Sequence, residues 1–82
     1  MFMNPTRLQK EVERRLLRIG LDLGRLDVLV MSGEVNLTGQ FIFRQTHKPV
    51  LSDDLRIVKQ SLFRIPGIQA VYCRNVDNPV FV

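Results

Sequence analysis

The residues best suited to contact a ligand are cations near the start of the chain. Between residues 5 and 19 they are interspersed with Leu and Val at helical spacing, so a helix there would gather most of them on one side. Such a face can bind lipid phosphates or a nucleic-acid backbone. A solvated face, with Glu11 paired to Arg15, explains the same pattern more simply. The candidate anion-binding residues are Arg7, Lys10, Arg14, Arg15 and Arg18.

A second group of basic residues lies later in the chain. Its members fall in a loop and on a second predicted helix, and the sequence leaves open whether they join the first group. These residues are Arg44, His47, Lys48, Arg56, Lys59 and Arg64.

The remaining reactive side chains do not form a catalytic or metal-binding pattern. His47 has no Cys or carboxylate at metal-ligand spacing. Cys73 falls in a predicted strand, where a thiol packs as a small apolar group. Asp53 and Asp54 follow a helix start, where the helix dipole favours acids. We therefore predict a non-enzymatic protein with no catalytic residue, no metal site and no cofactor.

Length and composition limit the architecture. A chain of 82 residues with 45% apolar residues is one small globular domain. We expect this domain to fill residues 1–82, with its core at 5–76 and a short apolar tail at 77–82. The single cysteine excludes an internal disulfide, so packing must supply the stability. The net charge of +4 favours anionic partners.

The sequence also carries no obvious targeting segment. We see neither a secretory signal pattern nor an apolar run long enough to cross a bilayer. We therefore expect a cytoplasmic or peripherally membrane-associated protein.

A β-hairpin between Leu26 and Phe43 is the element that should organise the fold. Ser32-Gly33 separates two runs rich in Val, Leu and Phe, which is typical of a two-residue turn. Folding there pairs Met31 with Glu34 and places one face toward the core. The predicted core face holds Leu26, Val28, Val30, Val35, Leu37, Phe41 and Phe43. The opposite face holds Asp27, Leu29, Asn36, Thr38, Gln40 and Ile42. At Gly39 we expect a bulge or a place where something packs very close to the backbone, and a helix crossing the sheet face is the preferred explanation.

Two helices and a third strand complete the order. Asn4-Pro5 should begin a helix over residues 5–19 that ends at Gly20. Ser52 should cap a second helix that ends before Pro66-Gly67. A third strand is predicted over residues 68–76, with Val71 and Cys73 on one face.

The buried helical stripes follow from the 3.6-residue period. In the first helix the stripe should be Leu8, Val12, Leu16 and Ile19, widened by Leu17. In the second it should be Leu55, Val58, Leu62 and Ile65, with Ile57 and Phe63 half buried. The sequence thus predicts an α+β fold, an αββαβ two-layer sandwich with both helices on one face of a three-stranded sheet. The order of the strands is left open.

Two short motifs resemble the BON domain. The first is the glycine turn with V-x-L-x-G, at Gly33, Val35, Leu37 and Gly39. The second is a helix running into I-P-G-I-x-x-V, at Ile65, Pro66, Gly67, Ile68 and Val71. The resemblance covers about residues 5–76. It implies an αββαβ module of bacterial proteins, without catalytic residues, that associates with membranes and binds phospholipid.

Three function classes stay open at this point. The first is a binding module for an anionic phospholipid surface or a protein partner, which uses the basic helix. The second is a small nucleic-acid-binding domain. The third is a structural or oligomerisation module, in which the third strand's edge or Val80-Phe81-Val82 joins two copies.

Overall fold

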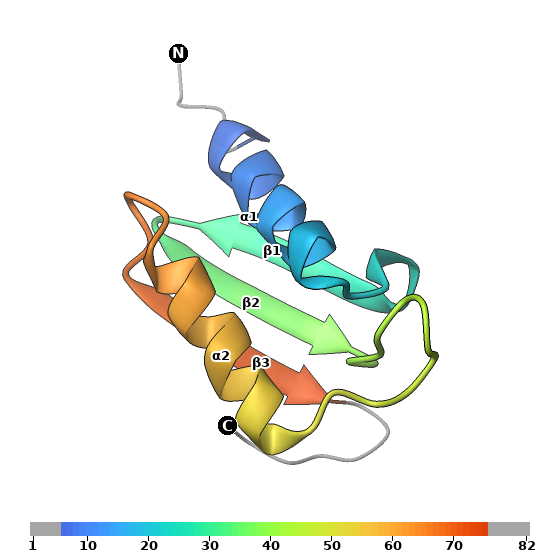
Figure 1. Cartoon of the computed structure of the whole chain (residues 1–82). Coiled ribbons are helices and arrows are strands. Elements are labelled where there is room, and N and C mark those ends of the chain that lie inside the picture. The colour runs from blue at the N-terminus through green and yellow to red at the C-terminus, as the bar shows by residue number, and fades with distance from the viewer. Residues whose placement is uncertain (1–5, 76–82) are drawn as a thin grey trace.

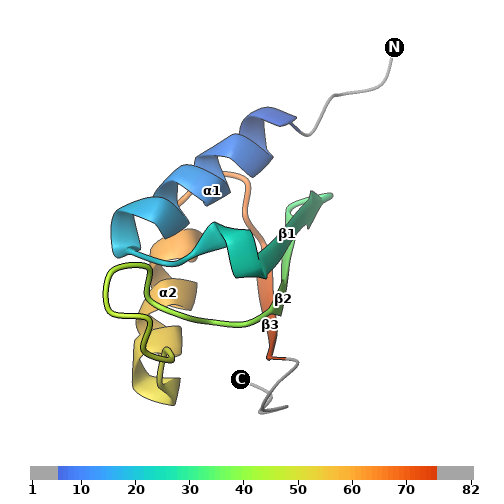
Figure 2. The same cartoon turned by 90° about the vertical axis from the view of Figure 1, so that its right-hand side faces the viewer.

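The structure is a two-layer α+β sandwich, as the sequence predicts. This computed structural model describes residues 6–75. Both helices lie on one side of a three-stranded sheet, which is seen face-on in Figure 1 and edge-on in Figure 2. The elements are α1 (Thr6–Ile19), a short 3₁₀ turn (Leu23–Arg25), β1 (Leu26–Met31), β2 (Glu34–Gly39), α2 (Ser52–Phe63) and β3 (Ala70–Asn75). The predicted helix start at Asn4-Pro5, Val76 and the tail at 77–82 lie outside the described residues.

The hairpin has the predicted register. Met31 pairs with Glu34, and the antiparallel ladder continues to Leu26 opposite Gly39. Ser32 and Gly33 have φ values of 51° and 79°, so both central residues of the turn are left-handed. That geometry matches the right-handed twist of the flanking strands. The turn chemistry and the alternation of apolar residues therefore agree on one register.

The second strand is shorter than predicted. β2 ends at Gly39, whereas the apolar alternation had suggested a strand as far as Phe43. After Gly39 the chain leaves the sheet and passes toward the helices, where Phe41 is fully buried and Phe43 packs at the edge of the core. Phe43 instead forms an isolated bridge with Leu21. Their apolar character thus reflects burial between the layers rather than strand pairing.

The predicted close packing against the backbone of Gly39 is confirmed, but the neighbour is not the helix that we expected. A Cβ at this position would lie 2.4 Å from the carbonyl oxygen of Arg25, and φ is +136°. The close neighbour is the backbone at the start of β1, not a helix crossing the sheet. Gln40 donates its backbone N–H to the same Arg25 carbonyl at 2.9 Å. Glycine is therefore needed where the hairpin ends and the chain turns away.

The third strand completes the sheet beside the middle strand. β3 pairs parallel with β2, and the order is β1-β2-β3. The connection through α2 explains this pairing, because parallel neighbours need a crossover of a dozen or more residues. Val71 and Cys73 are buried under the helices, as predicted, while Tyr72 is exposed on the other face.

The core lies between the sheet and the two helices. The stripes of both helices are buried or pack against the core as predicted, but three apolar residues expected at their margins are exposed: Leu17, Ile57 and Phe63. These three side chains lie on the flanks of the helices, outside the strip of helix surface that packs against the sheet. Leu21 and Val50, from the connecting segments, fill the core instead. The two connectors therefore contribute to packing as well as to topology.

The start of α2 also differs from the prediction. Ser52 is the first helical residue, and Leu51 occupies the cap position without a side-chain hydrogen bond. The helix begins one residue early because the backbone of Leu51 already accepts from the N–H of Leu55 at 2.9 Å. Asp53 and Asp54 lie in the first turn, where the helix dipole favours them.

Candidate anion-binding surface

α1 carries the candidate site on the side away from the core. Val12 and Leu16 are completely buried, and they fix which side of the helix meets the sheet. Residues about half a helical turn away must then face solvent. The sequence pattern alone therefore positions the cations of α1 on the side of the helix that faces away from the sheet.

Four of the five predicted residues are exposed on this surface. We call them the basic face: Arg7, Lys10, Arg14 and Arg18. Arg14 keeps 71% of its side chain exposed while its Nη1 lies 3.3 Å from Oε1 of Glu11. The expected pair of Glu11 with Arg15 is thus wrong, and Glu11 pairs with Arg14. An exposed pair of this kind contributes little to stability, so it does not commit Arg14 to a structural role.

Arg15 differs from the other four and has a structural partner. Its Nη1 donates hydrogen bonds to the backbone carbonyl of Ser61 at 3.0 Å and to the Ser61 hydroxyl at 3.3 Å. Ser61 lies in the last turn of α2, where carbonyl groups lack helical partners and the dipole favours a cation. The structure therefore places Arg15 between the two helices, away from the basic face.

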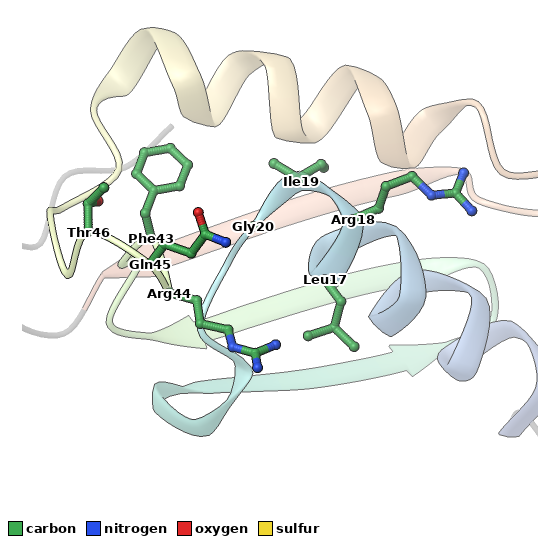
Figure 3. Close-up of a pocket in the computed structure, with 8 residues that line it drawn as sticks. All are labelled: Leu17, Arg18, Ile19, Gly20, Phe43, Arg44, Gln45 and Thr46. Carbon is green, nitrogen blue, oxygen red and sulfur yellow. The ribbon is translucent and has the colours of Figure 1, made fainter.

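A hollow lies at the end of α1, next to Arg18. It has a volume of about 630 Å³ and is formed by residues 17–20 together with residues 43–46 (Figure 3). The two segments are joined by the backbone N–H of Arg44, which donates to the carbonyl of Gly20 at 2.8 Å. Apolar groups of Leu17, Ile19 and Phe43 line it. Arg18 and Arg44 extend in different directions in Figure 3, so the two side chains do not enclose one ligand position between them.

The structure partly settles where the second basic group lies. Arg44 reaches the basic face, because it lines the same hollow as Arg18. Arg56 is exposed on α2, and Arg64 is exposed directly after the end of that helix. His47 is exposed in the loop with a left-handed φ of 58°. Arg44 is thus the member of this group that lines the hollow beside the candidate site.

In the described part of the chain, the reactive side chains do not gather into a metal site. Within residues 6–75 no three His, Cys, Asp or Glu side chains lie together as metal ligands would. Cys73 is buried, and this burial raises the pKa of its thiol, while the nearby Lys59 lowers it by a smaller amount. A buried protonated thiol is a poor nucleophile.

Sequence reasoning missed two features beside the basic face. Leu17 is 47% exposed, because it lies outside the stripe of α1 that is buried against the sheet. The hollow joins segments more than twenty residues apart, so no local pattern could have revealed it. The exposure of Leu17 could have been inferred from the helical period, which places Leu17 at an angle to Val12 and Leu16 around the helix axis.

Comparison with known proteins gives no relative: no family model, no curated protein and no solved structure matches the chain. Within the described part of the chain, neither helix combines the length and the apolar character that crossing a membrane requires.

Proposed function

We propose that the chain is a non-enzymatic binding module of the BON-like type that docks on anionic phospholipid surfaces through the basic face of α1. The observation that carries the proposal is the gathering of Arg7, Lys10, Arg14 and Arg18 on the outer side of one helix, where Glu11 pairs with Arg14. The αββαβ order and the resemblance of the glycine motifs support it. Cationic side chains near an anionic membrane each contribute about 1 kcal/mol to binding.

Leu17 and the neighbouring hollow favour a lipid surface over a nucleic acid. Leu17 is 47% exposed beside the cations, and the hollow presents further apolar groups from Ile19 and Phe43. The boundary between headgroups and acyl chains accepts such apolar groups, while arginine stems extend their charged ends toward phosphates. A nucleic-acid backbone would leave Leu17 in water.

The proposed contact is peripheral, because the core uses the rest of the apolar surface of α1. Val12 and Leu16 are completely buried against the sheet and cannot enter the membrane without unfolding the domain. Binding should then depend mainly on charge, and it should weaken as salt is raised because exposed charges are screened. Neutral vesicles should bind weakly through Leu17 alone.

Co-sedimentation with phosphatidylglycerol vesicles, against phosphatidylcholine vesicles, tests the proposal. The double variant Arg14→Glu with Arg18→Glu should lose at least about 30-fold in affinity for the anionic vesicles. The matched control is Arg56→Glu on α2 combined with Arg64→Glu at the end of that helix. Each double variant takes the formal net charge of +4 to zero, so only the location of the charge differs.

The control decides between a defined surface and simple charge attraction. We expect the α2 variant to retain most of the binding. Equal loss in both variants would show that net charge alone drives the interaction and would reject the basic face. Vesicle binding that is absent in the wild type, together with a gel shift of duplex DNA that the α1 variant abolishes, would replace the lipid with a nucleic acid. Circular dichroism must show the same fold in all three proteins.

A further inference from the structure

The hollow at the end of α1 is bounded by two segments that backbone hydrogen bonds hold in place. The N–H of Arg44 donates to the carbonyl of Gly20 at 2.8 Å. The N–H of Phe43 donates to the carbonyl of Lys48 at 2.9 Å, and the carbonyl of Phe43 accepts from the N–H of His47 at 2.9 Å. The second segment is therefore a closed turn that is fixed to the end of the helix. A ligand would meet a preformed site, so its binding would not have to order the loop.

Gly20 keeps the middle of the hollow open. A Cβ at this position would meet only Phe43, at 4.0 Å, so the missing side chain leaves space between the two segments. Figure 3 shows Ile19 and Phe43 on one side of Gly20. It shows Leu17 and Arg44 on the other side. The volume of about 630 Å³ falls within the range of about 300–1,000 Å³ that is typical of small-molecule sites, so the hollow has room for one small ligand.

The charged groups that line the hollow are cations, and the lining contains no acid. Arg18 and Arg44 are both exposed, and neither forms an ion pair with an acid among residues 6–75. An anionic group therefore complements the rim of the hollow. The apolar surfaces of Leu17 and Phe43 complement an apolar body. Together these features match a ligand that is an amphiphile with an anionic head.

The end of α1 determines how such a ligand lies. The helix dipole is negative at this end, so an anion is disfavoured directly against the last turn. The anionic head must instead lie at the tip of an arginine side chain, with the apolar body nearer the helix. Figure 3 shows Arg18 directed away from residues 43–46 and Arg44 directed to the side of Leu17. Arg44 is therefore the arginine that can hold the head while the body lies against Leu17.

We propose that the hollow binds one single-chain amphiphile with a phosphate head, as in lysophosphatidic acid. Its alkyl chain lies across Gly20 against Leu17 and Phe43, and the guanidinium of Arg44 donates two hydrogen bonds to the phosphate. A phosphate monoester suits this site better than a carboxylate, because it carries a charge of about −1.5 to −2 at pH 7 and three acceptor oxygens. The inference rests on the proposed function in that a phospholipid membrane is the source of the ligand. It adds a site for one molecule to a face that docks on many.

A titration of the full chain with octyl phosphate, followed by amide chemical shifts, tests the proposal without a membrane. The probe is used below the concentration at which it forms micelles. The shifts should centre on residues 17–20 and 43–46, with a dissociation constant below about 1 mM. 1-Octanol supplies the chain alone and inorganic phosphate the head alone, and each should bind at least about tenfold more weakly. Octanoate, which has the smaller charge, should also bind more weakly than octyl phosphate.

Two pairs of matched variants locate the site. Arg44→Gln should raise the dissociation constant of octyl phosphate at least about tenfold, because it removes the charged hydrogen bonds to the head. Arg56→Gln, at an exposed position of α2, should leave the constant within about twofold. Leu17→Asn should raise the constant at least about threefold by removing apolar contact with the chain. Its control is Ile57→Asn, since Ile57 is likewise exposed but lies on α2. All four positions are exposed, and thermal unfolding followed by circular dichroism checks that each variant folds.

Several results would overturn the proposal. Octyl phosphate that causes no shifts, or that shifts mainly residues outside the two segments, removes the hollow as the site. The same loss in Arg44→Gln and Arg56→Gln would show that general charge attraction explains the binding. Octanoate that binds more tightly than octyl phosphate would reject the phosphate head.

Vesicle co-sedimentation separates this inference from the proposed function. A wild type that binds phosphatidylglycerol vesicles but not octyl phosphate rejects the hollow as a site and retains the basic face. A wild type that binds octyl phosphate but no vesicles rejects docking through the basic face and retains the hollow.

Discussion

The guanidinium of Arg15 donates to the backbone carbonyl of Ser61 at 3.0 Å, and this contact joins the middle of α1 to the last turn of α2. The same carbonyl also accepts from the backbone N–H of Arg64 at 3.3 Å. A cation therefore lies where the dipole of α2 is negative and where the carbonyl groups lack the N–H of a residue four positions further along the helix. One arginine of the basic stretch thus stabilises the helical layer rather than presenting its charge to a ligand.

Replacing Arg15 should lower the stability more than replacing its neighbour. We expect Arg15→Met to reduce the free energy of unfolding by about 1–2 kcal/mol, since it removes a charged hydrogen bond that is partly buried. Arg14→Met is the control, and it should change the stability by less than about 0.5 kcal/mol because its ion pair is exposed. Urea denaturation measures both. Equal effects would show that the Ser61 contact adds nothing.

Two neighbouring leucines of α1 should differ sharply in their contribution to stability. Leu16 is completely buried, so Leu16→Ala should cost about 2–5 kcal/mol. Leu17 is 47% exposed, so Leu17→Ala should stay within about 0.5 kcal/mol. Under the proposed function, the Leu17 variant should nonetheless bind anionic vesicles more weakly. A large loss of stability in Leu17→Ala would instead place this side chain in the core, as the helical period had suggested.

Glycine at position 39 should be indispensable. Gly39→Ala would bring a Cβ to 2.4 Å from the Arg25 carbonyl in a left-handed backbone, and we expect a loss of about 3 kcal/mol or more. Gly20→Ala is the control that distinguishes backbone strain from a steric clash. Gly20 also has a positive φ of +107°, but a Cβ there would meet only Phe43, at 4.0 Å. That variant should cost about 1 kcal/mol. Thermal unfolding of the two variants gives the comparison, and similar losses would argue against the close approach.

Cys73 should make stability depend on pH in the alkaline range. Burial raises the pKa of its thiol in the folded state, so the folded chain holds the proton more tightly than the unfolded chain. The contribution is fully present below the unfolded pKa and is lost as pH rises toward the folded pKa. The stability of the wild type relative to Cys73→Ala should therefore fall above about pH 9. A difference that stays constant from neutral to alkaline pH would contradict this.

The hairpin shows what local sequence can determine. Ser32-Gly33 and the alternation around it predict the turn, the register and the buried face correctly, because all three depend on residues close in the chain. The apolar run continues to Phe43, and the same reasoning therefore extends β2 too far. Alternation reports burial, and it cannot distinguish a strand from a connector that is buried between two layers.

The relationships that sequence reasoning could not predict connect distant segments. Arg15 and Ser61 are 46 residues apart, and nothing near either residue indicates the contact. The order of the strands and the hollow beside Arg18 likewise depend on how the elements pack. The exposed cations of the basic face were predicted, since helical period alone separates them from Val12 and Leu16.

The parallel pairing of β3 with the middle strand has a consequence for synthesis on the ribosome. β1 and β2 can pair as soon as their hairpin emerges, but the other edge of β2 stays unpaired until β3 has left the exit tunnel. During that interval a nascent chain offers a hydrogen-bonding edge to its neighbours on the same message. Slow emergence of residues 70–75 would lengthen this exposure, so the rate at which this last strand leaves the ribosome should influence how much protein is recovered in soluble form.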